Sequence, residues 1–336
     1  MKPGKFTIQL AKKSDEQNWN SYLLRKKINI PLNYFSWSKI ISSNFWFQKP
    51  VFFIVKDKEG KVRGILCSFL VFSIKGKRKL YSSRFGMVVD NQQIAKLLFN
   101  YIKKFCKQKK VDDLLITSGF NKYDSKLNCF EKITMTLELK KDVDWLWNDL
   151  SPKTRNTIRR GYKNNYDFSS NLKYLNEFYN VYKKRMKQKG LGLLPLKFFN
   201  SIFHQNASSS RLFVALKNNK VIAGLILIYS KNGAQYTYAA DDNSFYKNNM
   251  HCLLWEVINF LYKKKIKLFD MSESTKNGGV YFFKKFFGCE EKKIFYYTNK
   301  KNTLQASQSL KKKNSFFSSF YLHIKKKFTI HFSRII

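Results

Sequence analysis

Apolar runs divide the first part of the chain into predicted strands and one helix. Residues 51–57 and 62–74 are rich in β-branched and aromatic side chains and flank a Lys-Glu-Gly turn, which predicts a β-hairpin. A third strand is predicted over 80–90, and a short buried strand over 112–118. Between these two strands, residues 91–110 repeat apolar side chains at helical spacing, so we expect a helix there.

The same order of elements returns in the second half. Residues 211–217 and 221–230 flank an Asn-Asn turn and predict another hairpin, which a strand over 234–240 extends. A helix is predicted over 250–265, and a buried strand over 266–272. Because a matching run of strand, turn, strand, strand, helix and strand is rarely coincidental, we interpret the pattern as an internal duplication.

The two predicted hairpins align without a gap. Phe53 and Gly64 have the same separation as Phe213 and Gly224, and apolar residues follow each glycine. A chain of 336 residues is long enough for two ordinary domains. Length and duplication therefore both predict a two-domain α/β protein.

A basic segment lies between the two copies. Ser151 is a good N-cap and Pro152 suits the first helical position, so a helix is predicted to begin here. On that helix Arg155, Arg159 and Lys163 fall on one side, one turn apart. The segment is either an ordinary solvated helix or a surface that grips phosphate. Its arginines favour the second interpretation, because guanidinium groups bind phosphate in a defined geometry.

A short aromatic segment follows the last predicted strand. As a helix, residues 281–287 place four phenylalanines in a band about 140° wide, which predicts that these side chains are core. Tyr281, Lys284 and Lys285 share the other side. Lys284 follows a polar loop at the carboxyl end of a buried strand, where open α/β sheets usually bind ligands. A lysine there can hold a phosphate or a developing oxyanion. The four phenylalanines are Phe282, Phe283, Phe286 and Phe287.

The charge of the chain is extreme. Lysine and arginine total 64 against 22 acidic residues, a formal net charge of +42 at pH 7. This balance predicts polyanionic partners such as nucleic acid, phosphorylated substrates or an anionic membrane surface. However, the basic residues are mostly lysine and occur with abundant Asn, Ile and Phe, which is typical of codon drift in an AT-rich genome. We therefore interpret most of the charge as solvated surface.

Several functional classes are disfavoured by what the sequence lacks. The five cysteines are scattered without a CxxC pair, and the four histidines show no ligand spacing, so we expect neither a disulfide framework nor a metal site. No apolar run approaches the ~20 residues of a spanning helix. The first ten residues lack the apolar core of a signal peptide. The sequence therefore predicts a cytoplasmic protein.

A series of blocks carries a family resemblance over residues 15–300. In order they are SPKTRNTIRRGYK, FYNVYKKRMKQKG, RLFVALKNNKVIAG, YAADDNSFYKNNMHCLLWEVI, KLFDMSES and GGVYFFKKFFG, with looser matches in GILCSFLVF and FGMVVD. Through these blocks the chain resembles the FemAB-like branch of the GNAT acyltransferase superfamily. The most specific block is the last, with a Phe-Lys pair two residues before an aromatic and a glycine.

The resemblance implies an α/β fold of two tandem GNAT-like domains, each a mixed sheet with flanking helices. We predict an N-terminal domain over 1–149, a C-terminal domain with the main site over 150–304, and a basic, aromatic tail over 305–336. The implied function is N-acyl transfer, in which an acyl or aminoacyl group moves onto an amine of a cell-envelope or polysaccharide precursor. The alternative is a non-catalytic nucleic-acid-binding or scaffold protein that uses its basic surface.

The resemblance also carries over individual site residues. The family's functional lysine maps to Lys284, as the catalytic group that steadies an oxyanion or a phosphate. The amine must lose a proton, and Asp270 is the first candidate base, with Asp241 and Asp242 as alternatives. The residues predicted to bind substrate are Arg155, Arg159, Tyr182, Arg185, Asn249, Trp255 and Phe283.

The acyl donor is left open by the sequence. GNAT enzymes bind the pyrophosphate of acyl-CoA with a Gly-rich turn at a helix N-terminus. Neither residues 242–250 nor residues 89–96 contain a glycine. We therefore predict no permanently bound cofactor, with acyl-CoA or aminoacyl-tRNA as co-substrate. The predicted partners are a phosphorylated or lipid-linked sugar or peptide precursor, and tRNA if it is the donor.

The C-terminal residues 309–336 combine an aromatic band with flanking lysines. Such a segment predicts an interfacial helix, in which aromatic side chains anchor at the headgroup boundary and lysines meet anionic lipid. The competing interpretation is a terminal helix packed on the second domain. If the segment is an interfacial helix, we expect the cytoplasmic protein to contact the inner face of the membrane through residues 309–336.

Overall fold

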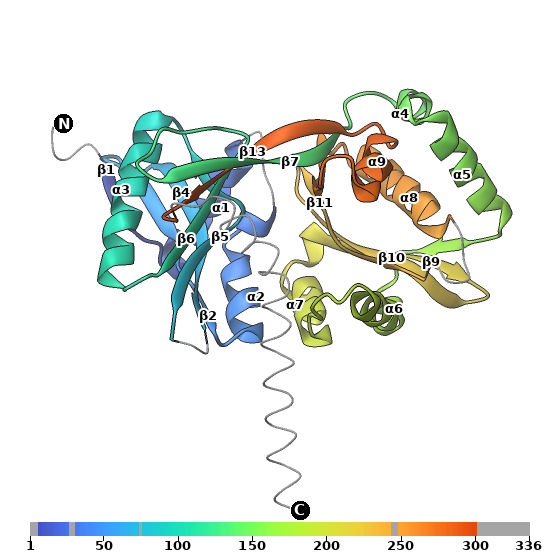
Figure 1. Cartoon of the computed structure of the whole chain (residues 1–336), viewed down its shortest axis with the longest axis horizontal. Coiled ribbons are helices and arrows are strands. Elements are labelled where there is room, and N and C mark those ends of the chain that lie inside the picture. The colour runs from blue at the N-terminus through green and yellow to red at the C-terminus, as the bar shows by residue number, and fades with distance from the viewer. Residues whose placement is uncertain (1–5, 27–30, 74–75, 243–247, 301–336) are drawn as a thin grey trace, which may run out of the picture.

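The computed structural model describes residues 6–26, 31–73, 76–242 and 248–300. Within them, thirteen strands form one mixed sheet flanked by helices on both faces (Figure 1). The strands are β1 (Phe6–Leu10), β2 (Gln48–Pro50), β3 (Phe53–Asp57), β4 (Val62–Phe72), β5 (Arg78–Val89), β6 (Asp113–Gly119), β7 (Asn128–Glu138), β8 (Asp167–Ser169), β9 (Ser210–Lys217), β10 (Lys220–Tyr229), β11 (Ala234–Asp241), β12 (Leu268–Glu273) and β13 (Glu290–Thr298). The α-helices are α1 (Glu16–Arg25), α2 (Ser36–Asn44), α3 (Gln92–Gln108), α4 (Val143–Asp149), α5 (Pro152–Lys163), α6 (Leu175–Gln188), α7 (Leu196–Gln205), α8 (Asn249–Lys263) and α9 (Gly279–Lys285).

The elements predicted from hydrophobic periodicity are confirmed. Both hairpins, both third strands, both following helices and both buried strands are present, each within two residues of its predicted bounds. The predicted start of the basic helix is also correct, because the Ser151 side chain accepts a hydrogen bond from the backbone N–H of Thr154 and Pro152 opens α5. These elements could be predicted because turn residues, caps and local periodicity specify them.

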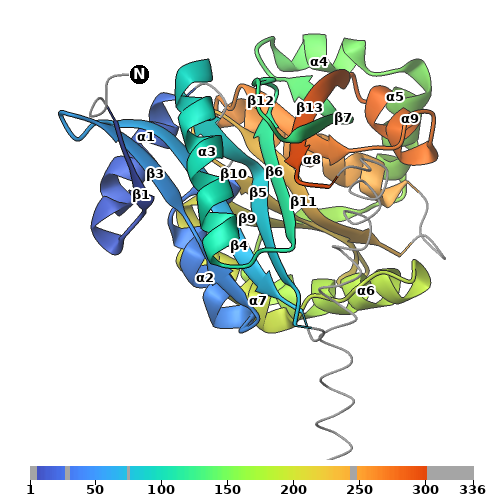
Figure 2. The same cartoon turned by 60° about the vertical axis from the view of Figure 1, so that its left-hand side comes forward.

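The two halves repeat one topology. In the first half β4 pairs antiparallel with β5, and β5 pairs parallel with β6. In the second half β10 pairs antiparallel with β11, and β11 pairs parallel with β12. The helix of each parallel unit, α3 or α8, packs on one face of its sheet, and Figure 2 shows α3 lying across the strands of the first half.

The halves are joined by an exchange of strands at the centre of the sheet. The strand order is β1-β3-β4-β5-β6-β13-β7-β12-β11-β10-β9-β8, so β7 lies beside β12 of the second half and β13 lies beside β6 of the first half. Both strands run between the two lobes in Figure 1. Each half therefore completes its sheet with a strand that the other half supplies.

The hydrophobic core continues across the junction of the halves. One buried cluster includes Trp37 of α2, Phe198 of α7 and Tyr296 of β13. The hydroxyl of Ser36 donates a hydrogen bond to the Asn206 side-chain oxygen, which fixes α2 beside the end of α7. The domain boundary between residues 149 and 150, predicted from the resemblance, falls between α4 and α5 and stays a prediction. The predicted tail, residues 305–336, lies outside the described residues.

The second half has helices on both faces of its strands. In Figure 1, α5, α8 and α9 lie above β9 and β10, and α6 and α7 lie below them. The two faces have separate buried clusters, because neighbouring residues of β9 such as Phe213 and Val214 point in opposite directions. None of the helices in the described part of the chain combines the length and apolar content needed to cross a bilayer.

Candidate functional site

Strands β11 and β12 pair only briefly and then diverge. Their parallel register covers Ala234 with Phe269 and Gln235 with Asp270, and ends there. The sheet is therefore open beyond Gln235, at the carboxyl ends of both strands. In open α/β sheets this is where ligands bind, and both predicted catalytic residues, Asp270 and Lys284, lie against this opening.

A β-bulge shapes the same stretch of β11. The register with β10 shifts between Ile226 and Leu227, which leaves Thr237 unpaired between Tyr236 and Tyr238. The Tyr236 hydroxyl is 3.9 Å from the sulfur of Met250 on α8, whereas the Tyr238 ring packs on α7 on the opposite face. Residues two apart normally share a face of a strand, so the bulge turns these two tyrosines to opposite sides.

Lys284 is buried at the opening, with only 4% of its surface exposed. Its Nζ atom donates hydrogen bonds to the carbonyl oxygens of Ser272 at 2.9 Å and Glu273 at 3.1 Å. Ser272 has a φ of 69°, a left-handed conformation in which a non-glycine residue is strained. Burial lowers the pKa of Lys284 from 10.5 to about 8, and the nearby Asp270 carboxylate opposes this shift.

The predicted aromatic band of α9 is wrong in part. Phe287 is buried and Phe283 is half-buried, but Phe282 and Phe286 are 39% and 40% exposed. Tyr281, predicted to lie on the outer side, is buried, and its hydroxyl donates a hydrogen bond to Glu291. The inner face of α9 is therefore defined by side chains that find polar partners on β12 and β13, which a hydropathy pattern cannot anticipate.

Asp270 is held by an arginine from the other half of the chain. Its carboxylate is 2% exposed and accepts hydrogen bonds from Arg84 Nε at 2.6 Å and Arg84 Nη2 at 3.1 Å. Thr134 Oγ1 and the Ser272 backbone N–H also donate to it, at 2.6 and 3.1 Å. Arg84 Nη1 lies 3.0 Å from Glu273 Oε1. To contact an amine, this carboxylate would have to give up hydrogen bonds to its present donors.

Arg84 was not predicted from the sequence. It lies in β5 beside Phe85, whose φ is 51°, and its partners are 50 to 189 residues away along the chain. The sequence offers one indication of a special role: Arg84 lies in the middle of β5, whereas the other basic residues of this strand lie at its start. The two alternative bases are also ion-paired. Asp241 Oδ1 lies 3.4 Å from Arg185 Nε, and Asp242 Oδ2 lies 2.7 Å from Lys184 Nζ.

The two predicted phosphate contacts on α5 differ in their surroundings. Arg155 Nη1 donates to the carbonyl oxygens of Asn148 at 2.6 Å and Leu150 at 2.7 Å, so this guanidinium ties the start of α5 to the end of α4. Arg159 is exposed and lies over the Trp147 ring, 5.4 Å from its centroid. Trp147 in turn packs on the predicted Trp255 of α8, with ring centroids 5.0 Å apart.

The start of α8 has the geometry of an anion site. Asn248 has a φ of 68°, which an asparagine tolerates better than most residues, and no side chain caps the helix in the described structure. The first-half helix α3 differs, because the Asn91 side chain accepts from the backbone N–H of Ile94. Asn249, the first residue of α8, is fully buried, and within the described structure its amide has no hydrogen-bond partner.

The start of α8 is therefore better suited to bind an anion than the start of α3. The backbone N–H groups that open a helix bind phosphate when no cap occupies them. The predicted Phe283 lies near this helix start, with its ring 5.0 Å from the ring of His251. Residues 242–250 lack the glycine of a Gly-rich phosphate-binding turn. Asn248 nevertheless has the left-handed backbone conformation that a glycine usually adopts in such a turn.

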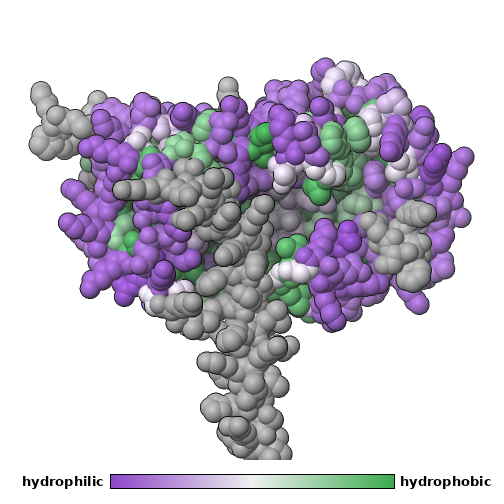
Figure 3. Space-filling model, viewed as in Figure 1, coloured by the Kyte–Doolittle hydropathy of each residue, from purple (hydrophilic) through white to green (hydrophobic). Residues whose placement is uncertain are grey.

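Tyr182 and Arg185 lie on α6, on the opposite face of the sheet from α8. Tyr182 is 4% exposed and packs edge-on against Phe199 of α7. It lines a cavity against β11. Figure 3 shows hydrophobic residues gathered in a recess of the right-hand lobe, within an otherwise largely hydrophilic face. Tyr182 thus lies on one face of the sheet, and Asn249 and Lys284 lie on the other.

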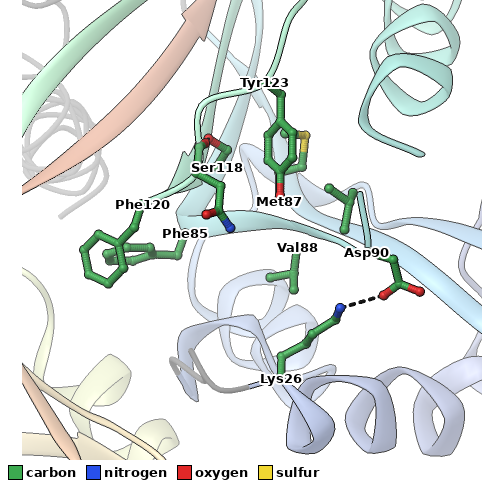
Figure 4. A pocket seen from close by; sticks show the side chains of 10 residues that line it. Lys26, Phe85, Met87, Val88, Asp90, Ser118, Phe120 and Tyr123 are labelled. Atoms are coloured by element: carbon green, nitrogen blue, oxygen red, sulfur yellow. Dashed lines mark hydrogen bonds and ion pairs between the residues drawn. The ribbon is translucent and has the colours of Figure 1, made fainter. Parts of the chain in front are cut away.

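The first half has a cavity of its own, of about 250 Å³, where β5 and β6 diverge. Figure 4 shows it between the Phe85 and Phe120 rings on one side and the Lys26–Asp90 ion pair, 2.6 Å long, on the other. Tyr123 also faces it from above. The cavity adjoins Arg84, whose guanidinium lies 5.0 Å from the centroid of the Phe85 ring.

Solved structures share this fold, although no protein-family model and no curated protein sequence matches the chain. FemX has a TM-score of 0.68 at 15% identity, over 87% of this chain and 98% of FemX. A tandem GNAT protein from the clavulanic acid biosynthesis pathway has a TM-score of 0.53 at 10% identity, over 88% and 98% of the two chains. N-myristoyltransferase from Saccharomyces cerevisiae with bound myristoyl-CoA has a TM-score of 0.50 at 12% identity, over 89% and 83%. The predicted fold is confirmed: the chain has the tandem GNAT-like fold that FemX also has.

Proposed function

We propose that this protein is an N-acyltransferase that moves an acyl or aminoacyl group onto an amine of a cell-envelope or polysaccharide precursor. The observation that carries the proposal is the buried ammonium of Lys284 at the point where β11 and β12 diverge. Burying a charge is costly unless it is paired, and among the described residues only backbone carbonyls hold it directly. Buried ionisable groups with a shifted pKa cluster at functional sites, and this supports the proposal.

In the proposed reaction the acceptor amine attacks the acyl carbonyl carbon. A C–N bond forms, the bond from the acyl carbon to the sulfur or oxygen of the carrier breaks, and the amine proton ends on the departing carrier. An ammonium has three N–H donors, of which the carbonyls of Ser272 and Glu273 take two. The third N–H of Lys284 is the donor that stabilises the oxyanion of the tetrahedral intermediate.

Asp270 has a positioning role in this proposal. With Arg84 and Thr134 it fixes the strained segment at Ser272, whose carbonyl oxygen in turn holds Lys284. The proton of the amine then leaves through the departing carrier or through groups of the substrate. This assignment replaces the general base that the sequence favoured, because an ion-paired carboxylate would have to break its bonds with Arg84 to act as one.

The donor in this proposal places its anionic part at the start of α8. Acyl-CoA and aminoacyl-tRNA both carry phosphate, and the uncapped N–H groups of α8 suit either. The fold shared with N-myristoyltransferase, whose structure holds myristoyl-CoA, supports the thioester. Arg159 and the exposed face of α5 are proposed to meet phosphates of the acceptor. A lipid-linked acceptor would also give the predicted tail its membrane contact.

The proposal is tested with two neighbouring lysines of α9. Lys284 is buried in the opening, whereas Lys285 is exposed on the same helix, which makes Lys285→Ala a matched control. Soluble and lipid-linked precursors are compared by mass spectrometry in cells with the wild-type gene, with no gene, and with each variant. We expect a mass addition that disappears without the gene and in Lys284→Ala, but persists in Lys285→Ala.

Once the product is known, the same variants are compared as purified proteins. Lys284→Ala should lower turnover about a hundredfold or more, as the loss of an oxyanion donor does in other enzymes. Circular dichroism and melting curves check that both variants are folded. An unchanged precursor profile without the gene would refute the function. Equal losses in the two lysine variants would instead refute the role of Lys284.

A further inference from the structure

A cavity of about 340 Å³ lies in the second half, on the face of β11 that α6 and α7 cover. Tyr182 and the bulged residue Thr237 contribute to its wall. Hydrophobic side chains form the rest, including Ile41 (α2), Phe45 (directly after α2), Met186 (α6), Leu191 and Leu194 (the segment after α6), Phe198 (α7) and Ala239 (β11).

The lining of this cavity is apolar. Of its described side chains, none is charged, and the polar ones are Tyr182, Thr237 and Tyr238. The Thr237 hydroxyl already donates to the carbonyl of Gln235 at 3.0 Å. The Arg185–Asp241 ion pair, on the same two elements α6 and β11, does not line the cavity. Such a cavity binds an apolar group, because a polar group would lose its bonds to water without gaining partners.

The position of the cavity relates it to the opening in the sheet. Thr237 bulges from β11 just past Gln235, the last residue of β11 paired with β12. The start of α8 lies on the other face with α9, the helix that carries Lys284, because residues of both helices pack in the same buried cluster as Tyr236. A ligand with its phosphates at α8 would pass through the opening to reach this cavity on the far face.

We propose that this cavity holds the apolar chain of the acyl donor, so that the donor is a thioester with a chain longer than acetyl. The proposal rests on the proposed transfer function and adds the class of acyl group. The reacting carbonyl lies between the two ends of such a donor, at the level of the strands where Lys284 stands. An apolar part of the acceptor is the competing occupant.

Donor binding is measured without any acceptor. Isothermal titration calorimetry of the full chain compares CoA with acetyl-, butanoyl-, hexanoyl- and octanoyl-CoA. Because each buried methylene contributes to affinity, we expect binding to tighten about three- to fourfold per added carbon until the cavity is full. Affinity that does not depend on chain length, or no binding of any thioester, overturns the proposal. The Lys284 experiment still decides the transfer function in that case, because it makes no assumption about the donor.

Variants of Met186 and Leu191 test whether this cavity causes the dependence of affinity on acyl chain length. Met186→Phe narrows this cavity, and should weaken octanoyl-CoA binding at least about tenfold while leaving acetyl-CoA unchanged. A folding defect would weaken all thioesters alike. Leu191→Ser at the rim should weaken the longer chains, whereas Leu172→Ser, a leucine of similar exposure outside the cavity, should not. Chain-length dependence that survives Met186→Phe and Leu191→Ser assigns the acyl chain elsewhere and overturns the proposal.

Discussion

At the residue scale, the charged groups around Lys284 explain why this buried lysine has a lowered pKa. Arg84 pairs with Asp270 and Glu273, so two carboxylates near Lys284 are already neutralised by another group. Tyr296 donates a hydrogen bond to Glu273, and Lys132 lies 3.3 Å from the same carboxylate. Within the described part of the chain, the direct partners of Lys284 are backbone carbonyls, and burial is the largest influence on its pKa.

The lowered pKa of Lys284 predicts how stability depends on pH. The unfolded chain holds this proton up to about pH 10.5, but the folded protein releases it at about pH 8. Between these values the unfolded state binds more protons, so wild type should gain stability as pH rises. Comparing wild type with Lys284→Met isolates this lysine from other titrating groups. The difference in unfolding free energy should shift in favour of wild type between pH 7 and 9.5, as denaturant titrations will measure. A difference independent of pH over this range would show that the lysine has an ordinary pKa.

At the element scale, the junction of α4 and α5 gives Arg155 a structural task in addition to any contact with phosphate. Its guanidinium joins two carbonyl oxygens at the end of α4, and the Ser151 backbone N–H donates to the carbonyl of Phe286. Carbonyls at a helix end lack intrahelical partners, and a side-chain donor satisfies them. The junction therefore also positions α9, which carries Lys284.

The two arginines of α5 should respond differently to alanine. Arg155→Ala should lower the free energy of unfolding by about 1–2 kcal/mol, because it removes two charge-assisted hydrogen bonds from a half-buried site. Arg159→Ala removes an exposed guanidinium and should change stability by less than about 0.5 kcal/mol. Chemical denaturation provides the measurement. If both variants changed the free energy of unfolding equally and only slightly, Arg155 would have no structural role, and both arginines would remain candidates for phosphate contacts only.

At the scale of the whole molecule, the exchanged strands make each half depend on the other. β6 borders β13 and β12 borders β7, so separating the halves would leave long strands with unpaired edges. Residues 1–149 and 150–336 expressed separately should aggregate or lack cooperative unfolding. Expressed together, they should assemble into a complex that size-exclusion chromatography detects. A soluble monomer of residues 1–149 with a cooperative melt would contradict this dependence.

The sequence by itself determined the elements that local patterns encode. Alternation, helical periodicity and turn residues identified both copies of the strand and helix order, and Ser151 with Pro152 located the start of α5. The duplication predicted two domains, and the family resemblance of the sequence blocks predicted the tandem fold. The element predictions succeeded because the interactions that specify them act between residues close along the chain.

The tertiary structure decided which side chains meet. Arg84 and Asp270 are 186 residues apart, and nothing in the strand that carries Arg84 indicates its partner. On α9, Lys284 is buried and Phe282 is exposed. Lys284 can be buried because carbonyl oxygens of β12 accept its hydrogen bonds, and these partners cannot be inferred from the hydropathy of α9. Such pairs follow from the packing of whole elements. The exchange of β7 and β13 likewise depends on how the two halves of the chain lie beside each other in the sheet. Polar contacts between distant elements therefore had to be read from the fold.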